Sequence, residues 1–321
     1  MESISPPMRK ACLKKILLTL IAGLFVAVYF IPSNVFPTEE YFVLRKETLN
    51  LLDHGVLLSP SHNSCASGLD LLVLVLSVVG SKDKRCSIRN TWGRVNQPWP
   101  LLNSRPTMKV VFLFGVAPTP EENLELKYES TLHNDILQIN ATESYFVPTL
   151  KILMAFKWMK EGCSSVKYVL KTDDDVFVNL PFMMERVNSM KGRFILGDKL
   201  PYALSHRSGK HTVSSKEYPF VFYPPYLIGY AYIMTGEVAL SMLNAFYHMP
   251  FLKIEDVYIG GILPRATSTS VMQIHPSWID NGQKVDICDF VQRKLIAGAN
   301  IDNDVIYKIW QTFKEPWRCR K

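Results

Sequence analysis

The 321-residue sequence has little of what marks a nucleic-acid-binding or zinc-binding protein. It contains no Arg- or Lys-rich reading helix, no zinc-finger spacing and no interleaving of aromatic and basic residues, which argues against nucleic acid as a partner. Its Cys and His residues are not closely clustered, so no zinc site is expected. It also lacks internal repeats and low-complexity tracts, and with 48% hydrophobic residues it is too apolar for a disordered chain.

Basic residues outnumber acidic ones, which gives a formal net charge of +7 and an isoelectric point near 9.0. Such a surface is either simply solvated or attracts anionic ligands, with nucleotide phosphates and lipid headgroups ahead of nucleic acid. The mean hydropathy is slightly positive at +0.06, which suggests that part of the chain lies in a membrane.

An uncharged apolar stretch, Ile16–Ile31, lies near the N-terminus. With its flanking residues it is about long enough to span a thin bilayer. A cleaved signal peptide is the alternative, but the preceding segment is long and Ile31–Asn34 lacks a small-x-small cleavage site. Basic residues before the stretch and acidic residues after it place the N-terminus in the cytosol. We therefore expect a type II protein with a cytosolic tail, a signal-anchor, a stem and a lumenal catalytic domain at residues 1–15, 16–31, 32–67 and 68–321.

In a lumenal chain the cysteines face an oxidising space. Cys65 and Cys163 each stand a few residues before a predicted strand, so they are expected to meet at one edge of the sheet as a disulfide. Cys86, inside a helix-like stretch, is the candidate for an unpaired thiol. Asn140 begins an Asn-Ala-Thr glycosylation sequon, which suits a lumenal surface loop.

From Leu69 onward, strand-like and helix-like segments alternate. Continuous Val- and Leu-rich runs predict strands buried on both faces. The expected strands are 69–79, 108–116, 134–140 and 167–175, and the expected helices are 84–93, 121–133 and 148–162. The alternation predicts an α/β nucleotide-binding architecture, with a parallel sheet covered on both faces and ligands beyond the carboxyl ends of its strands.

Three carboxylates, Asp173, Asp174 and Asp175, end the fourth predicted strand. Crowded carboxylates are driven toward protonation unless a cation compensates them. Mg²⁺ and Mn²⁺ typically bind one or two carboxylates together with substrate phosphates, so the triplet indicates a metal–diphosphate site, with a solvated acidic turn as the alternative. A phosphatase of the haloacid dehalogenase type would use Asp173 and Asp175, but its nucleophile opens the fold, whereas three strands precede this triplet.

Other segments offer further parts of a site. Glu255 and Asp256 open an apolar, helix-like stretch, where they either cap the helix or supply a general base. The segment 217–239, rich in Tyr with a Pro-Pro turn, reads either as a sugar-binding wall or as ordinary core. A basic group after the first strand either contacts nucleotide phosphates or base, or is solvated: Lys82, Lys84, Arg85 and Arg89.

Six stretches resemble, in order, the β1,3-galactosyltransferase family, which also contains β1,3-N-acetylglucosaminyltransferases (glycosyltransferase family 31). They are RCSIRNTWG, ESTLHNDILQ, TLKILMAFKW, YVLKTDDDVFVN, EYPFVFYPPYLIGYAYIMTGE and IEDVYIGG, and they cover nearly all of residues 69–263. The resemblance implies a GT-A-type fold with a Rossmann-like, mostly parallel sheet. It also implies inverting transfer from a UDP-sugar, with UDP-galactose ahead of UDP-N-acetylglucosamine or UDP-N-acetylgalactosamine. The acceptor would be the 3-hydroxyl of a glycan on a glycolipid or glycoprotein, in the Golgi.

The resemblance also assigns roles to individual residues. Asp256 is expected to be the catalytic base, with Glu255 nearby in the acceptor site. Mn²⁺ or Mg²⁺ is expected at Asp173 and Asp175, and the donor at Asp173 and Asp174 together with Arg85, Arg89 and Trp92. The expected acceptor wall comprises Tyr226, Gly229 and Tyr230.

Several positions depart from the family pattern. Leu227 and Ile262 stand where members often carry cysteines, and the family's Asn-Leu-Thr sequon reads Val147–Thr149. The histidine of the C-terminal helix is absent from RKLIAGAN, with His275 as a candidate substitute at the metal. A catalytically silent lumenal binding or chaperone protein of the same fold is the alternative function. Retention of both the triplet and the Glu-Asp pair favours an enzyme.

Overall fold

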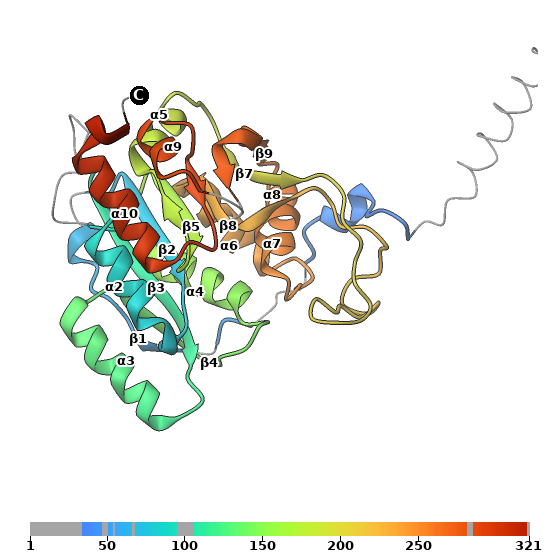
Figure 1. Ribbon diagram of the computed structural model, residues 1–321. Helices are drawn as coiled ribbons and strands as arrows, with labels where there is room; N and C mark the ends of the chain where they lie inside the picture. Colours follow the sequence, from blue (N-terminus) through green and yellow to red (C-terminus); the bar gives the residue numbers. More distant parts are fainter. Residues whose placement is uncertain are drawn as a thin grey trace, which may run out of the picture.

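Helices cover a central sheet in the computed structural model (Figure 1), which describes residues 34–46, 51–53, 55–65, 68–94, 106–280 and 285–319. The predicted tail and signal-anchor, residues 1–15 and 16–31, lie outside these residues. Within the residues that the structure describes, no helix is both long and apolar enough to cross a membrane.

The main sheet, as far as the chain is described, has eight strands in the order β1-β4-β3-β2-β5-β8-β7-β9. They are β1 (Val56–Leu58), β2 (Leu71–Leu76), β3 (Met108–Val116), β4 (Ile136–Thr142), β5 (Tyr168–Asp173), β7 (Phe194–Leu200), β8 (Tyr226–Thr235) and β9 (Ser270–Gln273). A smaller sheet joins β10 (Ile279–Asp280), β11 (Ala297–Gly298) and β6 (Phe177–Val178).

The four strands predicted from Val- and Leu-rich runs form one parallel block, β4-β3-β2-β5. Successive side chains of a strand point to opposite faces, so in β2 Leu72 and Leu74 enter one core while Leu71, Val73 and Val75 enter the other. The expectation of a mostly parallel sheet is only partly right, because β8 runs antiparallel to both β5 and β7, and β1 antiparallel to β4. The fold is therefore mixed α/β.

Helices cover both faces of the sheet, as predicted. One core packs against α4 (Pro148–Gly162), α6 (Gly236–Phe246) and α8 (Leu263–Ala266). The other packs against α2 (Lys82–Asn90), α3 (Pro120–His133), α5 (Leu180–Asn188), α9 (Ile287–Val291) and α10 (Asn303–Lys314). The start of α3 is set by a capping box, in which Thr119 accepts from the backbone of Glu122 and Glu122 accepts from the backbone of Thr119.

Part of the predicted stem belongs to the folded domain. Phe42 and Leu52 are buried in the first core, and β1 extends the sheet beside β4. The boundary between stem and catalytic domain at residues 67 and 68 is therefore wrong. Weak periodicity hid these contacts, since short segments that pack on an existing core carry little pattern of their own.

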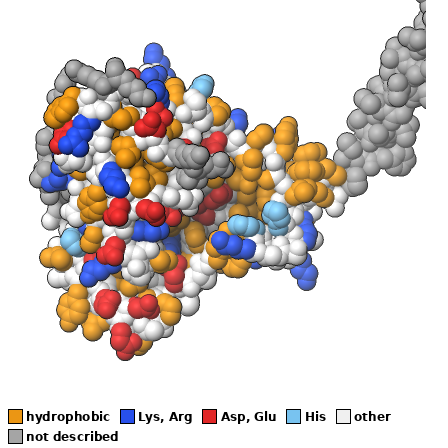
Figure 2. Space-filling model, viewed as in Figure 1, with side chains coloured by type: hydrophobic (Ala, Val, Ile, Leu, Met, Phe, Trp, Pro, Cys, Tyr) orange, Lys and Arg blue, Asp and Glu red, His pale blue; other side chains and the backbone are white. Residues whose placement is uncertain are grey.

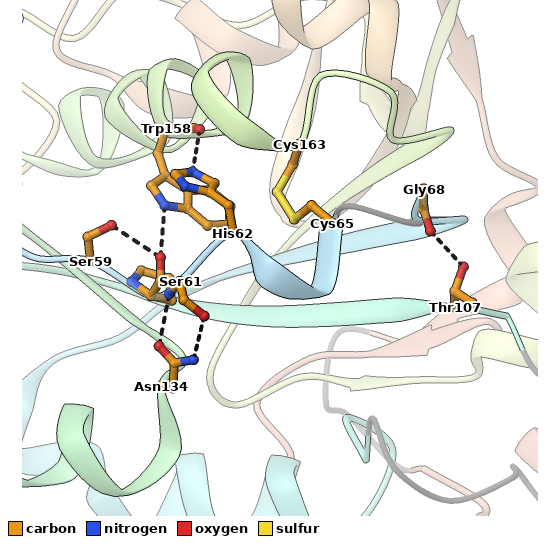
Figure 3. The surroundings of a disulfide bond; sticks show 10 residues. Ser59, Ser61, His62, Cys65, Gly68, Thr107, Asn134, Trp158 and Cys163 are labelled. Carbon is orange, nitrogen blue, oxygen red and sulfur yellow. Dashed lines mark hydrogen bonds between the residues drawn. A yellow bond between two sulfur atoms is a disulfide. The ribbon is translucent and has the colours of Figure 1, made fainter.

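A disulfide joins Cys65 to Cys163 as predicted and ties this N-terminal segment to the end of α4. Figure 3 shows it close to Trp158, whose ring stacks on His62 with centroids 4.6 Å apart. The indole N–H of Trp158 also donates to the carbonyl of Pro60 at 3.2 Å. A second disulfide, Cys288–Cys319, was not predicted from the sequence, and Cys86 is free as expected.

Candidate active site

A cleft of about 1050 Å³ opens at the carboxyl ends of β2 and β5. Because β8 runs antiparallel to β5, its second half pairs with β5, with Lys171 opposite Tyr232 and Thr172 opposite Ala231, and its first residues continue past the carboxyl end of β5. The cleft is lined by all of the predicted catalytic, metal-binding and acceptor residues and by Asp174 of the predicted donor set. They are Asp173, Asp174, Asp175, Tyr226, Gly229, Tyr230, Glu255 and Asp256.

The acidic triplet forms one half of the cleft. Asp173 is the last residue of β5, and Asp174 and Asp175 occupy the turn that follows it. The Nζ atom of Lys84 on α2 lies 3.2 Å from Oδ1 of Asp174 and 3.3 Å from Oδ2 of Asp175. The hydroxyl of Ser77, just after β2, donates to Oδ2 of Asp174 at 2.8 Å. Burial lowers the pKa of Lys84, but the two carboxylates outweigh it and the net pKa is raised.

Two carboxylate oxygens therefore converge on a single cationic atom. Hard oxygen ligands so arranged suit Mg²⁺ or Mn²⁺, and Asp174 with Asp175 is the converging pair, whereas Asp173 was predicted to act with Asp175. In the described part of the chain, no group of three or more His, Cys, Asp or Glu side chains is arranged to hold a metal alone.

His275 does not line the cleft. Its ring accepts from the backbone N–H of Ser277 at the start of a short 3₁₀ helix. The expectation that His275 takes the place of the missing C-terminal histidine at the metal is therefore wrong.

The predicted donor residues Arg85, Arg89 and Trp92 lie behind the cleft rather than in its lining. Arg85 is fully buried and forms an ion pair with Glu129 of α3 at 2.6 Å. Its Nη1 atom also donates to Ser77 Oγ at 3.2 Å, so it reaches the triplet through that hydroxyl. Arg89 pairs with Asp135 at 2.8 Å, and Trp92 is fully buried. These side chains support the site from the core, and the structure gives them no surface in the cleft.

Lys171 joins the triplet to the second half of the cleft. Its Nζ atom lies 3.0 Å from Oδ1 of Asp173 and 3.1 Å from Oε2 of Glu255, and it also donates to the carbonyl of Gly229. The hydroxyl of Tyr232 donates to the other oxygen of Glu255. Burial raises the pKa of Asp173 to about 6 and that of Glu255 to about 7, although Lys171 acts in the opposite direction on both.

Asp256 lies beside this buried network and lines the cleft. It sits in the short helix α7 (Glu255–Val257), which continues through a π-helical turn, Tyr258–Ile262, into α8. A side chain at Gly260 would collide with the backbone of Leu227, so glycine lets this helix approach the start of β8. The backbone N–H of Gly229 then donates to Oδ2 of Asp256 at 3.0 Å, which fixes the direction of the carboxylate.

Gly229 leaves no room for a side chain, and Gly229→Ala should displace Asp256. The added Cβ would lie 2.2 Å from Oδ1 of Asp256 and 2.9 Å from Oε2 of Glu255. A displacement of about 1 Å at a reacting group can lower a rate about 10²-fold, so we expect a loss of that size in kcat. Gly80→Ala is the matched control, because its Cβ would meet nothing within 4 Å. Steady-state kinetics that leave Gly229→Ala as active as Gly80→Ala would contradict the placement of Asp256.

The lining of the cleft also contains residues that the sequence did not single out. Tyr145 and His211 both line it and are hydrogen-bonded, hydroxyl oxygen to Nδ1, at 2.7 Å. Lys151 of α4 is buried and pairs with Glu143 at 2.7 Å. Lys171 and Lys151 stand inside apolar runs, where a single lysine gives no sequence signal of its charged partners.

The remaining predicted site is the sequon. The side chain of Asn140 is exposed, but it lies in β4 rather than in the surface loop that was expected.

Known proteins resemble this chain over most of its length. The sequence profile described as galactosyltransferase matches residues 83–275. Human beta-1,3-galactosyltransferase 5 is 29% identical over 296 residues, covering 90% of this chain and 91% of that protein. Mouse UDP-GalNAc:beta-1,3-N-acetylgalactosaminyltransferase 1 is 30% identical over 276 residues, covering 80% and 78% respectively.

Similarity to solved structures is much weaker. The galactosyltransferase LgtC, in complex with donor and acceptor sugar analogues, aligns with 77% of this chain and 99% of its own, with 10% identity and a TM-score of 0.36. The sequence matches confirm the resemblance seen in the six segments, and the chain belongs to the galactosyltransferase family.

Proposed function

We propose that this chain is an inverting, metal-dependent β1,3-glycosyltransferase of the GT-A type, which moves a hexose from a UDP-sugar to the 3-hydroxyl of a glycan acceptor. The observation that carries the proposal is the ion pair of Lys171 with both Asp173 and Glu255. Through it, an acidic triplet suited to a metal–diphosphate group and a carboxylate suited to a general base share one cleft. Membership of the galactosyltransferase family supports hexosyl transfer as the chemistry.

Asp256 acts as the base in this proposal. Its carboxylate faces the cleft and is oriented by the N–H of Gly229, whereas Glu255 is buried and held by Lys171 and Tyr232. The acceptor hydroxyl gives its proton to Asp256, its oxygen forms the new bond to C1 of the donor sugar, and the bond from C1 to the UDP oxygen breaks with its electron pair. A single displacement of this kind inverts C1 and needs no covalent intermediate.

The leaving diphosphate faces the triplet and Lys84. Asp174 and Asp175 would hold Mn²⁺ or Mg²⁺ together with the diphosphate, and the ion would act as a Lewis acid on the leaving group. Lys84 contacts the same two carboxylates and supplies a further positive charge on this side of the cleft. The ion pairs of Lys171 with Asp173 and Glu255 hold the two halves of the cleft in a fixed position relative to each other.

The donor sugar is proposed from the relatives. Their names include galactosyl and N-acetylgalactosaminyl transfer, which supports UDP-galactose first and UDP-N-acetylgalactosamine next, with UDP-N-acetylglucosamine as a further candidate. Tyr226 and Tyr230 would offer aromatic surface to the acceptor sugar.

The proposed location is the Golgi membrane, with Ile16–Ile31 as a type II anchor and the catalytic domain in the lumen. The uncharged apolar sequence of that stretch supports the anchor. Two disulfides, Cys65–Cys163 and Cys288–Cys319, support an oxidising compartment for the domain.

A donor screen tests the proposal. The purified full chain is offered UDP-galactose, UDP-N-acetylgalactosamine, UDP-N-acetylglucosamine and UDP-glucose with a panel of glycan acceptors. We expect transfer from at least one of the first three, loss of transfer in excess EDTA, and recovery on adding Mn²⁺. Full activity in EDTA would reject the metal. UDP binding without any transfer would favour a silent binding protein, and hydrolysis of a generic phosphate ester would favour a phosphatase.

A further inference from the structure

Four exposed apolar side chains gather where the described chain begins, and we name them the apolar patch: Phe36, Tyr202, Leu204 and Val221. Their exposed fractions are 44%, 67%, 54% and 39% respectively. The ring of Phe36 lies 6.3 Å from that of Tyr202 and stacks at 4.9 Å on Phe222. Figure 2 shows hydrophobic side chains concentrated on the lobe at the right of the view. Clustered exposed apolar side chains mark interaction sites rather than ordinary surface.

Backbone hydrogen bonds attach the first described residues to this patch. The N–H of Val221 donates to the carbonyl of Asn34, and the N–H of Phe222 to that of Val35, each at 2.9 Å. Leu204 and Phe222 pair as an isolated β-bridge. The apolar patch is therefore fixed to Asn34 and Val35 by backbone hydrogen bonds.

The length of chain before Asn34 sets how far the patch can lie from a membrane. Only Pro32 and Ser33 separate Asn34 from Ile31, the last residue of the apolar stretch. Three residue steps span at most roughly 10 Å. A headgroup layer is roughly 5 to 8 Å thick on each side of the hydrocarbon. If Ile16–Ile31 crosses the bilayer, Asn34 and the patch must lie at the headgroup layer or just above it.

The patch is continuous with the cleft. Leu204 belongs to both, and its neighbours Ala203 and His206 also line the cleft. Tyr202 is well suited to a membrane interface, which accommodates both its apolar ring and its polar hydroxyl, and Phe36 adds apolar surface beside it. A protein partner would have to find the patch by diffusion, whereas the tether holds the bilayer beside it at a high effective concentration.

We infer that the apolar patch docks on the bilayer in which the chain is anchored, and that the cleft consequently takes its acceptor from glycolipids of that membrane. This inference rests on the proposed function and names its acceptor class. Docking fixes the height and tilt of the cleft, so sugars carried on lipids reach Asp256, while acceptors in solution gain nothing from the patch.

The docking itself is tested with the full chain in vesicles that contain brominated phosphatidylcholine, which quenches indole fluorescence at the membrane surface. Tyr202→Trp places an indole in the patch. Tyr128→Trp is the matched control, because Tyr128 is 69% exposed on α3, which Figure 1 shows on the far side of the sheet from the patch. Relative to the parent chain, we expect added quenching for Tyr202→Trp and none for Tyr128→Trp. Equal quenching of the two, as when a protein or a second copy covers the patch, would overturn the docking.

The acceptor class is tested by comparing transfer to a membrane glycolipid with transfer to the same oligosaccharide in solution. Phe36→Ser with Tyr202→Ser should lower transfer to a glycolipid in the same vesicle by about three- to tenfold, because the tethered cleft loses its orientation. Transfer to the same oligosaccharide free in solution should not change. The control pair is Tyr128→Ser with Leu132→Ser, which are 69% and 77% exposed on α3. An equal loss with both acceptors, or no loss with either, would overturn the inference, and transfer to the free sugar reports separately on the proposed function.

Discussion

Asp256→Asn should lower kcat for sugar transfer by about 10²- to 10⁴-fold, which is the range that a positioned general base contributes. The asparagine amide oxygen can still accept from the N–H of Gly229, so the local geometry is kept while the basic group is lost. Affinity for UDP should not change. Asp256 follows Glu255, which pairs with Lys171, whereas the proposed diphosphate site is formed by Asp174 and Asp175 beside Lys84. Initial rates and calorimetric titration with UDP separate the two effects.

Asp70→Asn is the control for this variant. Asp70 lies just before β2, at the opposite end from the cleft, where its carboxylate accepts from the backbone N–H of Thr107 at 2.9 Å. The change removes the same charge from the chain without touching the site, and it should leave kcat unchanged. Loss of UDP binding in Asp256→Asn would move Asp256 to the donor side, and retained transfer would remove it as the base.

Lys171→Met should be strongly destabilising as well as inactive. The variant leaves Asp173 and Glu255 facing each other without the cation that now lies 3.0 and 3.1 Å from them. Removing one partner of a buried ion pair typically costs about 3 to 5 kcal/mol, and we expect a loss of that size in the free energy of unfolding. Lys167→Met on the same segment is the control, since its exposed amine donates to Asn188 at 3.1 Å, lies 5.2 Å from the centroid of the Tyr168 ring and forms no ion pair among the described residues. Urea titration at neutral pH measures the free energy of unfolding of both variants and of the parent chain.

The deficit of Lys171→Met should also depend on pH. Burial raises the pKa of Asp173 to about 6 and that of Glu255 to about 7 even with Lys171 present, so the two carboxyls protonate readily as the pH falls. Protonated carboxyls no longer repel each other, and the difference from the parent should shrink below about pH 6. A variant as stable as the parent at pH 8 would show that Lys171 is not what holds the two halves of the cleft together.

Much of this arrangement could be predicted because its signals are local. Continuous apolar runs gave the parallel block, and Pro148 marked the start of α4 at the residue where the structure begins it. The triplet falls at the end of β5, as a buried strand followed by three aspartates indicates. The Glu-Asp pair likewise meets the triplet in one cleft, as the six family segments implied.

What escaped prediction depends on partners far away in the sequence. Arg85 and Arg89 read as a ligand-binding basic group, yet both pair with acidic residues contributed by α3 and the residues after it. Lys171 looked like one polar residue in a strand, because nothing local shows that antiparallel β8 brings Tyr232 and Gly229 beside it. The antiparallel direction of β8 depends on tertiary contacts that no local pattern encodes, and it decides which residues of β8 lie near the triplet.

The measurement that tests the central claim most directly is the structure of the product. The full chain, Mn²⁺, the donor that serves best in the screen and a defined acceptor are incubated together, and the linkage and anomeric configuration of the isolated product are read by NMR. A single base, Asp256, facing one metal–diphosphate site predicts inversion, so the product should carry a β-linked sugar on the 3-hydroxyl of the acceptor. An α-linked product would show retention at C1, and it would contradict the single displacement and the role of Asp256 together.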